Sequence, residues 1–188
     1  MDYFTSDLHF DDKNLARKRG YDDADVMNED ILATIIPIVK PGDRLFILGD
    51  LSLGKYPNMN EILPRIKCDK FLIKGNHDHD KFLKKISDNF VWIEHYHELK
   101  YKDSDTGFKN LLVLQHYPLL TWNRAHYGTY HIHGHCHGSL IYKDTTRMDV
   151  SWDCHKRLLT IKDIKEYMLT KTYKVVDHHV NRNIIITE

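Results

Sequence analysis

The sequence predicts an α/β domain built on a mixed β-sheet. Short runs of aliphatic, aromatic and β-branched residues end in glycine or polar residues, which is typical of buried strands followed by turns; DRLFILGD and DKFLIKGNHD are the clearest examples. Between these runs lie segments whose apolar residues recur at helical spacing. Strands are denser in the second half of the chain, so we expect a mixed sheet rather than a purely parallel one.

Strands and helices alternate in the first half of the chain. Residues 23–39 have apolar side chains at helical spacing, Val26 and Ile31 among them, and acidic residues in the first turns that suit the helix dipole. Pro37 is expected to end or bend this helix, because proline cannot donate the next backbone hydrogen bond. The other elements expected here are strands at residues 2–7, 43–50 and 69–78 and helices at residues 58–67 and 79–87.

The second half of the chain is expected to contain four strands and one helix. The turn sequence DSDTG at residues 103–107 predicts a hairpin between two of the strands. The alternating tail, residues 171–188, suggests an added strand pair, whose edge could pair with a second copy in a homodimer. The expected strands are residues 90–101, 109–117, 128–134 and 147–152, and the expected helix is residues 160–169.

Composition favours one soluble domain over residues 1–188, a length that suits a single buried core. The 27 basic residues balance 27 acidic ones, so no overall field attracts nucleic acid or a membrane surface. Three cysteines without C-x-x-C spacing are typical of a reducing compartment rather than of a disulfide framework. No apolar run approaches the roughly 18 residues of a membrane span, and the first residues do not resemble a leader. We therefore expect a cytoplasmic protein without a membrane partner.

Polar side chains follow five of the expected strands. In open α/β sheets, ligands bind at the carboxyl ends of strands, where loops from several strands meet. The mixture of carboxylate, imidazole and amide groups suits Mn²⁺, Fe or Zn²⁺ better than thiolate-loving metals. The five blocks are Asp7-Leu8-His9, Gly49-Asp50, Gly75-Asn76-His77-Asp78, His116 and Gly134-His135-Cys136-His137.

Each block on its own is equally typical of a turn or a helix cap, and only the five together favour a metal site. Within HIHGHCHG, we expect His131 and His133 to be packed and Gly134 to permit the turn that re-aims the next two histidines. Cys136 is expected to be a small buried residue. Arg124 is a candidate substrate contact, because a guanidinium group can donate two parallel hydrogen bonds to one phosphate.

The order D-x-H, G-D, G-N-H-D, H and G-H-x-H resembles that of the calcineurin-like metallophosphoesterases. Three longer stretches also resemble the small stand-alone enzymes of bacteria and phages: FTSDLHFDDKN, LQHYPLLTWNRAHYGTYHIHGHCHG and DVSWDCHKRLLTIKDI. The match runs from Asp7 to His137, about 70 % of the chain. The resemblance implies two packed mixed β-sheets flanked by helices in four αββα layers, with a binuclear metal site at one sheet edge. Asp12 stands where the small members often have a histidine.

The resemblance also implies a role for each residue of the blocks. His77 would protonate the leaving oxygen, and Asp78 would orient its imidazole and favour the charged form. The cofactor would be two divalent ions, Mn²⁺ first, with Fe, Ni or Zn as alternatives. One ion would be held by Asp7, His9, Asp50 and His137, and the second by Asp50, Asn76, His116 and His135, with Asp50 shared.

We therefore expect a metal-dependent phosphoric ester hydrolase. The short chain leaves little room for a capping domain, so a phosphodiesterase acting on nucleotides or nucleic acid ends is favoured. A phosphomonoesterase of the same fold remains the alternative within this class. From a different class, a non-catalytic metal-binding scaffold or sensor would keep the ligands without cleaving an ester.

Overall fold

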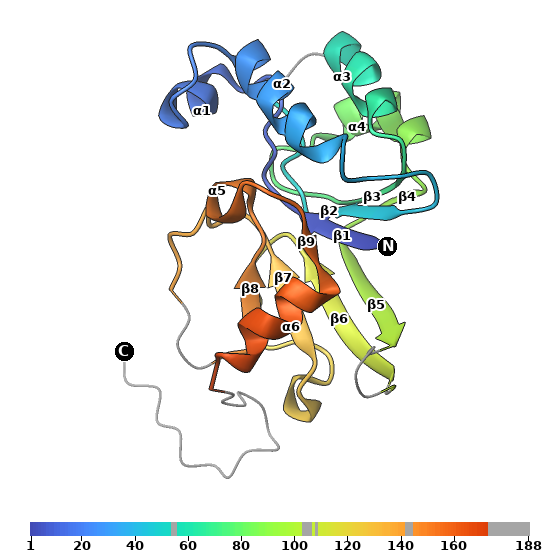
Figure 1. The fold of residues 1–188 in the computed structure, drawn as a ribbon, viewed down its shortest axis with the longest axis vertical. Coiled ribbons are helices and arrows are strands. Elements are labelled where there is room, and N and C mark those ends of the chain that lie inside the picture. Colours follow the sequence, from blue (N-terminus) through green and yellow to red (C-terminus); the bar gives the residue numbers. More distant parts are fainter. Residues whose placement is uncertain (54–55, 103–106, 108, 142–144, 173–188) are drawn as a thin grey trace.

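The computed structural model of the protein describes residues 1–53, 56–102, 107, 109–141 and 145–172. Two β-sheets pack face to face, and a group of helices covers the outer face of one of them (Figure 1). Both sheets contain parallel and antiparallel pairs. The expected α/β class with two mixed sheets flanked by helices is therefore confirmed.

The first sheet has the strand order β4-β3-β2-β1-β9. All of its neighbouring strands are parallel except β9, which runs antiparallel to β1. Phe4 pairs with Phe46 and Phe46 with Phe71 in the register, and their rings stack at centroid distances of 5.3 and 4.7 Å. The strands are β1 (Asp2–Thr5), β2 (Arg44–Ile47), β3 (Asp69–Ile73), β4 (Trp92–Glu94) and β9 (Leu159–Thr160).

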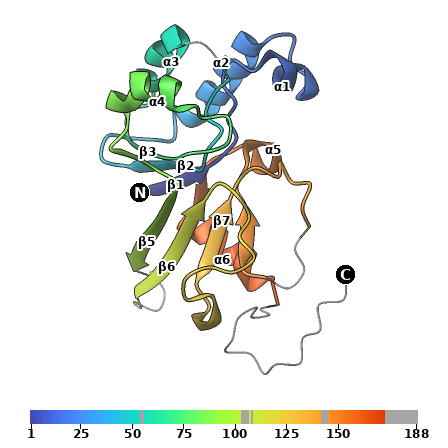
Figure 2. The same cartoon turned by 180° about the vertical axis from the view of Figure 1, so that it is seen from behind.

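The second sheet has the strand order β5-β6-β7-β8, of which Figure 2 labels the first three. The antiparallel pairing of β5 with β6 agrees with the expected hairpin, although most of its turn lies outside the described residues. The pairs β6 with β7 and β7 with β8 are parallel. The strands are β5 (Tyr96–Lys102), β6 (Lys109–Gln115), β7 (Tyr130–His133) and β8 (Arg147–Asp149).

The longest helix, α2, ends at Ile35, two residues before Pro37, as the sequence predicts. The sequence analysis missed α1, α5 and β9, because each is too short to show a periodic pattern; α1 buries only one side chain and begins where the Asp12 carboxylate accepts from two backbone N–H groups. The helices are α1 (Lys13–Lys18), α2 (Ala24–Ile35), α3 (Tyr56–Ile62), α4 (Asp80–Ile86), α5 (Trp152–His155) and α6 (Ile161–Leu169), with 3₁₀ turns η1 (Leu63–Arg65), η2 (Ser87–Asn89) and η3 (Ala125–Tyr127).

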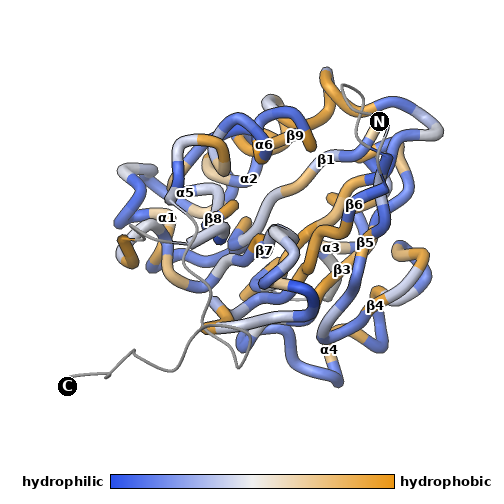
Figure 3. The backbone as a smooth tube through the Cα atoms, turned by 90° about the horizontal axis from the view of Figure 1, so that it is seen from below, coloured by the Kyte–Doolittle hydropathy of each residue, from blue (hydrophilic) through white to orange (hydrophobic). Residues whose placement is uncertain are grey.

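Two apolar cores result from the alternation of side chains along the strands. On β2, Leu45 and Ile47 face the helices α2, α3 and α4, whereas Phe46 faces the second sheet. The core between the sheets is closed by Ile164 and Met168 of α6. Apolar stretches accordingly follow the inner strands in Figure 3, and hydrophilic stretches follow the periphery.

The outer face of the second sheet is covered by the segment between β6 and β7. The backbone N–H of Leu119 donates to Nε2 of His131, and the Trp122 ring lies 5.3 Å from that imidazole. In the described residues, the helical structure of this segment is limited to the 3₁₀ turn η3. The outer helical layer that four αββα layers would require here is therefore not seen in the part of the chain that the structure describes. No helix in the described residues has the length and apolarity to span a membrane. The tail beyond residue 172, where a strand pair is expected, lies outside the described residues.

Candidate metal centre

The five polar blocks lie together where strands of both sheets end. The loops after β1, β2 and β3 of the first sheet meet those after β6 and β7 of the second. Backbone hydrogen bonds join these loops: the Asp7 N–H donates to the Gly49 carbonyl, and the Gly134 N–H to the His116 carbonyl. The structure therefore brings together residues that are up to 130 positions apart in the sequence, because Asp7 and His137 come into contact.

An unusual backbone conformation is concentrated in these loops. Left-handed φ angles are rare outside glycine and cost roughly 1–2 kcal/mol each for an L-residue. Strain of this kind accumulates at functional sites, where the surrounding fold imposes it. Five candidate ligands adopt it: Asp7 (φ 54°), His9 (51°), Asp50 (51°), His135 (70°) and His137 (47°).

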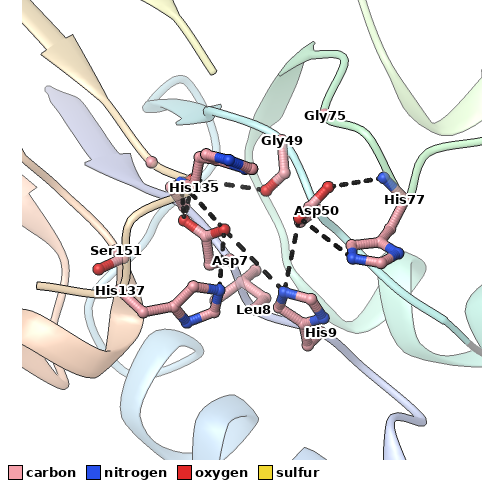
Figure 4. Close-up of polar contacts among 12 residues, drawn as sticks. Asp7, Leu8, His9, Gly49, Asp50, Gly75, His77, His135, His137 and Ser151 are labelled. Carbon is pink, nitrogen blue, oxygen red and sulfur yellow. Dashed lines mark hydrogen bonds and ion pairs between the residues drawn. The ribbon is translucent and has the colours of Figure 1, made fainter. Parts of the chain in front are cut away.

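The side chains of the blocks form two adjoining clusters, and Figure 4 shows the first of them with Asp50 beside it. In the first, Asp7, His9 and His137 offer ligand atoms that all lie within 4.8 Å of one another. In the second, Asp50, His116 and His135 do the same. The membership of both clusters agrees with the grouping that the sequence resemblance implies.

Asn76 joins the second cluster. Its Oδ1 lies 3.0 Å from Nε2 of His116 and 2.9 Å from Nδ1 of His135. An amide oxygen facing two imidazole nitrogens is a donor set that borderline divalent metals accept. The second cluster thus contains all four of the residues predicted for the second ion.

Asp50 joins the two clusters. Its Oδ2 lies 3.6 Å from Nε2 of His9 in the first cluster and 3.6 Å from Nε2 of His116 in the second. Its Oδ1 accepts a hydrogen bond of 2.9 Å from the backbone N–H of His77. One carboxylate therefore faces both clusters, as a bridging ligand must.

His9 supplies the test of whether the side chains fit a cation. Both of its ring nitrogens are buried and make no hydrogen bond, and Nε2 faces Asp7 Oδ1 at 4.0 Å and Asp50 Oδ2 at 3.6 Å. These separations are too long for hydrogen bonds, and an unpaired buried nitrogen is unfavourable. A cation between the three groups would satisfy them all, so the residues fit a metal.

The electrostatics of the first cluster agree with this fit. Burial raises the pKa of Asp7 to about 7 and lowers the pKa of His9 to about 4. Burial also lowers the pKa of His116 in the second cluster. Neutral imidazole is the form that binds metal, and a divalent cation offsets the unfavourable burial of carboxylate charge.

Two residues that the sequence analysis missed orient His137. The Asp153 carboxylate lies 2.6 Å from Nδ1 of His137, which directs Nε2 toward Asp7 at 3.5 Å. Arg19 donates to both Asp153 oxygens, at 2.8 and 2.6 Å, and to the carbonyls of Asp7 and Leu8. The hydrogen bond to Asp153 raises the pKa of His137. Carboxylates in this position fix ring orientation and tautomer in metal sites.

Asp12 has a similar place beside His9. Its Oδ2 lies 3.3 Å from Nδ1 of His9, and its Oδ1 accepts from the backbone N–H groups of Asn14 and Leu15. At the position where this chain departs from the pattern that it resembles, a carboxylate therefore lies beside Nδ1 of His9, although the two groups do not form a hydrogen bond.

His77 lies over the centre without belonging to either cluster. Its Nε2 is 4.0 Å from Asp50 Oδ2, and 41 % of its side chain is exposed. Its backbone N–H donates a hydrogen bond to the other carboxylate oxygen of Asp50, Oδ1. His77 is thus fixed at its backbone, while its side chain is partly accessible to solvent.

The role predicted for Asp78 is wrong. Its side chain is fully buried below the loops and accepts hydrogen bonds from the backbone N–H groups of Asp50, Leu51 and Gly75, at 2.8 to 3.0 Å. Burial raises its pKa to about 6 against these hydrogen bonds. Asp78 positions the Asp50 loop through these three backbone donors, and among the described residues no hydrogen bond or ion pair joins it to the imidazole of His77.

The predicted substrate contact of Arg124 at this site is also wrong. Arg124 lines a cavity together with Lys109 and Leu111, at the start of β6, whereas His116 follows the end of that strand. At about 3.3 Å of rise per residue, the two ends are roughly 20 Å apart. The error arose because the chain runs back along the sheet after His116, which proximity in sequence does not reveal.

The expected packing of His131 and His133 is confirmed, since both are fully buried. Nδ1 of His131 lies 3.1 Å from the Val113 carbonyl, and its Nε2 accepts from the Leu119 N–H. His133 and Arg147 are its charged or titratable neighbours. Cys136 is half-buried rather than buried, and burial raises its pKa.

We expect His131 to make the metal-free protein sensitive to acid. Burial, followed by the neighbouring His133, lowers the pKa of His131 from 6.5 to about 3. The contribution of His131 to the free energy of unfolding is fully present above pH 6.5 and falls between pH 6.5 and 3, because only the unfolded chain takes up the proton there. The loss at pH 4.5 is on the order of 2–3 kcal/mol.

Urea unfolding of the wild type and of His131→Asn at pH 7 and 4.5 measures this dependence. Asparagine keeps an amide donor for the Val113 carbonyl but does not titrate, so its unfolding free energy should change less between the two pH values. An equal change in both proteins would show that the acid sensitivity arises elsewhere.

The comparisons with known proteins support the fold and name no activity. No family model matches the chain. It is similar to "Uncharacterized protein MJ1445" of Methanocaldococcus jannaschii, with 27 % identity over 141 residues that cover 73 % of this chain and 69 % of that protein. A crystal structure described as a protein of unknown function, AQ665 from Aquifex aeolicus, superposes with a TM-score of 0.65 at 23 % identity. That match covers 89 % of this chain and 98 % of the other.

Proposed function

We propose that the protein is a binuclear-metal-dependent phosphoesterase with the calcineurin-like metallophosphoesterase fold. The observation that carries this proposal is the position of Asp50, whose Oδ2 lies 3.6 Å from a ligand nitrogen in each cluster. A shared carboxylate between two mixed oxygen and nitrogen donor sets is what two-metal phosphoryl-transfer sites require. The order of the five sequence blocks and the two packed mixed sheets support the same family.

The donor set suits Mn²⁺ best, with Fe, Ni or Zn as alternatives, because imidazole, carboxylate and amide ligands occur together. When bound, such ions polarise the phosphoryl oxygens and activate water for in-line attack. The chain's own contribution is to hold the ligands: Asp153 fixes the ring of His137, and Asp78 fixes the loop of Asp50. His77, accessible above Asp50, donates the proton to the leaving oxygen.

A phosphodiester is the favoured substrate, either a nucleotide or a nucleic acid end. A phosphomonoester carries a second negative charge, which active sites usually neutralise with an arginine or lysine. The guanidinium next to the centre, Arg19, is fully engaged by Asp153 and by two backbone carbonyls. Arg19 therefore binds protein groups and is not available to a substrate. A site without a free guanidinium suits a diester, which carries a single negative charge.

Hydrolysis of two chromogenic esters tests the function. We expect metal-stripped protein reloaded with Mn²⁺ to cleave bis-p-nitrophenyl phosphate faster than p-nitrophenyl phosphate. His77→Ala should retain the metal and lose roughly 10²–10⁴ in kcat, the usual contribution of a general acid. His79→Ala is the matched control, since this exposed histidine makes no side-chain cap bond and lies two residues away.

Three results would count against parts of this proposal. Faster cleavage of the monoester would favour the phosphomonoesterase. Equal loss of activity in His77→Ala and His79→Ala would remove His77 from the chemistry. Tight binding of two ions without cleavage of either ester, with Mn²⁺, Fe²⁺, Ni²⁺ or Zn²⁺, would favour a scaffold or sensor.

A further inference from the structure

A second polar cavity lies at the opposite end of the second sheet from the candidate metal centre. It has a volume of about 550 Å³ and is lined by Lys100 of β5, by Lys109 and Leu111 of β6, and by Arg124 and Tyr127 from the segment before β7. No carboxylate lines it among the described residues. A concave site with three cationic side chains is therefore present in a chain whose overall formal charge is zero.

The cations of this cavity are not paired with Glu98, a carboxylate on β5. Glu98 lies two residues from Lys100 on the same face of the strand, but its oxygens accept from the amide of Asn123, at 2.9 and 3.0 Å, and from the Tyr96 hydroxyl at 2.7 Å. Within the described ranges, Lys100, Lys109 and Arg124 form no ion pair with the protein. Their charged groups can therefore contact a ligand, because the hydrogen bonds of Glu98 go to Asn123 and Tyr96 instead.

The segment that carries Arg124 is held in a defined conformation. Arg124 has a left-handed backbone (φ 60°), and its carbonyl accepts from the N–H groups of Tyr127 and Thr129. Trp122 Nε1 donates to the Thr129 carbonyl and hydroxyl, which closes the loop on itself. Strain in a non-glycine residue that the surrounding bonds enforce is typical of a site built for binding.

Tyr127 gives the cavity an aromatic wall. Its side chain is 75 % exposed, and the Arg124 guanidinium lies 5.9 Å from the centre of its ring. An exposed tyrosine next to a guanidinium is suited to stacking on a nucleobase, and lysines near it are suited to the phosphate. The cavity volume lies within the range of small-molecule sites, which is about 300–1,000 Å³.

We propose that this cavity binds a nucleoside phosphate unit, with the base on Tyr127 and the phosphate between Arg124, Lys100 and Lys109. The unit is either a free nucleotide or one residue of single-stranded nucleic acid. The site is separate from the metal centre and does not depend on its chemistry.

Binding by the full chain in the presence of a chelator tests the proposal without turnover. Calorimetry with a 5′-mononucleotide measures the affinity for a free nucleotide. Fluorescence anisotropy with a labelled single-stranded oligonucleotide measures the affinity for nucleic acid. Arg124→Gln and Tyr127→Ala should each weaken binding about tenfold, which corresponds to one charge-assisted hydrogen bond or one stacking contact. The matched control is Lys171→Gln, since Lys171 also lies over a tyrosine ring, 4.4 Å from that of Tyr167, outside the cavity.

The results distinguish a free nucleotide from single-stranded nucleic acid as the ligand, and they can also contradict the proposal. Tighter binding of the oligonucleotide, with an affinity that falls steeply with salt, identifies nucleic acid; binding of the mononucleotide alone identifies a free nucleotide. Binding that is unchanged in Arg124→Gln and Tyr127→Ala would overturn the proposal. Equal binding of inorganic phosphate and nucleotide would overturn it too, because Tyr127 would then have no base to contact. Loss of phosphoesterase activity has no bearing on any of these results.

Discussion

Asp50→Ala is expected to lose both metal ions and phosphodiester hydrolysis together. The carboxylate is buried between the clusters, with Oδ2 at 3.6 Å from both His9 and His116. Alanine removes one ligand from each ion and leaves three candidate ligands on each side: Asp7, His9 and His137 for the first ion, and Asn76, His116 and His135 for the second. We expect fewer than one ion per chain after dialysis and a fall in kcat/KM of at least about 10³, because metal polarisation contributes several kcal/mol.

Metal content by elemental analysis and ester hydrolysis in the same preparations measure this prediction. Asp80→Ala is the matched control, since that carboxylate is exposed and pairs with Lys74 outside both clusters. His77→Ala supplies the opposite pattern, with metal retained and turnover lost. An Asp50→Ala protein that kept two ions would disprove the bridging role.

The sequence was sufficient to predict which side chains converge, because the carboxyl ends of parallel strands meet at one edge of a sheet. Asp7, Asp50 and Asn76 each follow a strand of the first sheet, and the parallel pairing of β1, β2 and β3 then places them side by side. His116 and His135 follow parallel strands of the second sheet in the same way.

The sequence was not sufficient to predict where side chains point after the strands end. Asp78 follows His77 directly, yet its carboxylate turns below the loops toward three backbone donors. Arg19 and Asp153 are 134 positions apart and meet only because α1 and α5 pack beside the first cluster. Neither residue belongs to the five blocks or to a periodic pattern, so the sequence analysis assigned them no role.

Gly134→Ala is expected to destabilise the protein and to displace Asp7. A Cβ at this position would lie 1.9 Å from Ser6 Oγ and 2.3 Å from Asp7 Oδ2, far inside contact distance. Ser6 cannot move away freely, because its Oγ is within hydrogen-bond distance of two acceptors, Asp7 Oδ2 at 2.6 Å and the Leu48 carbonyl at 2.8 Å. The loops after β1 and β7 must therefore separate, at a cost of roughly 3 kcal/mol or more, the upper range for overpacking.

Urea unfolding and metal titration of Gly134→Ala measure both consequences, and Gly20→Ala is the control. Gly20 has φ +86° with nothing within 4 Å of its Cβ position, so alanine there adds backbone strain without a clash. Because Gly134 has no left-handed φ, its replacement adds the clash without that strain. We expect a much larger loss of unfolding free energy in Gly134→Ala, together with weaker binding of the ion held by Asp7, His9 and His137. Equal losses in the two variants, with metal binding intact, would mean that the close approach of these two loops does not seat Asp7.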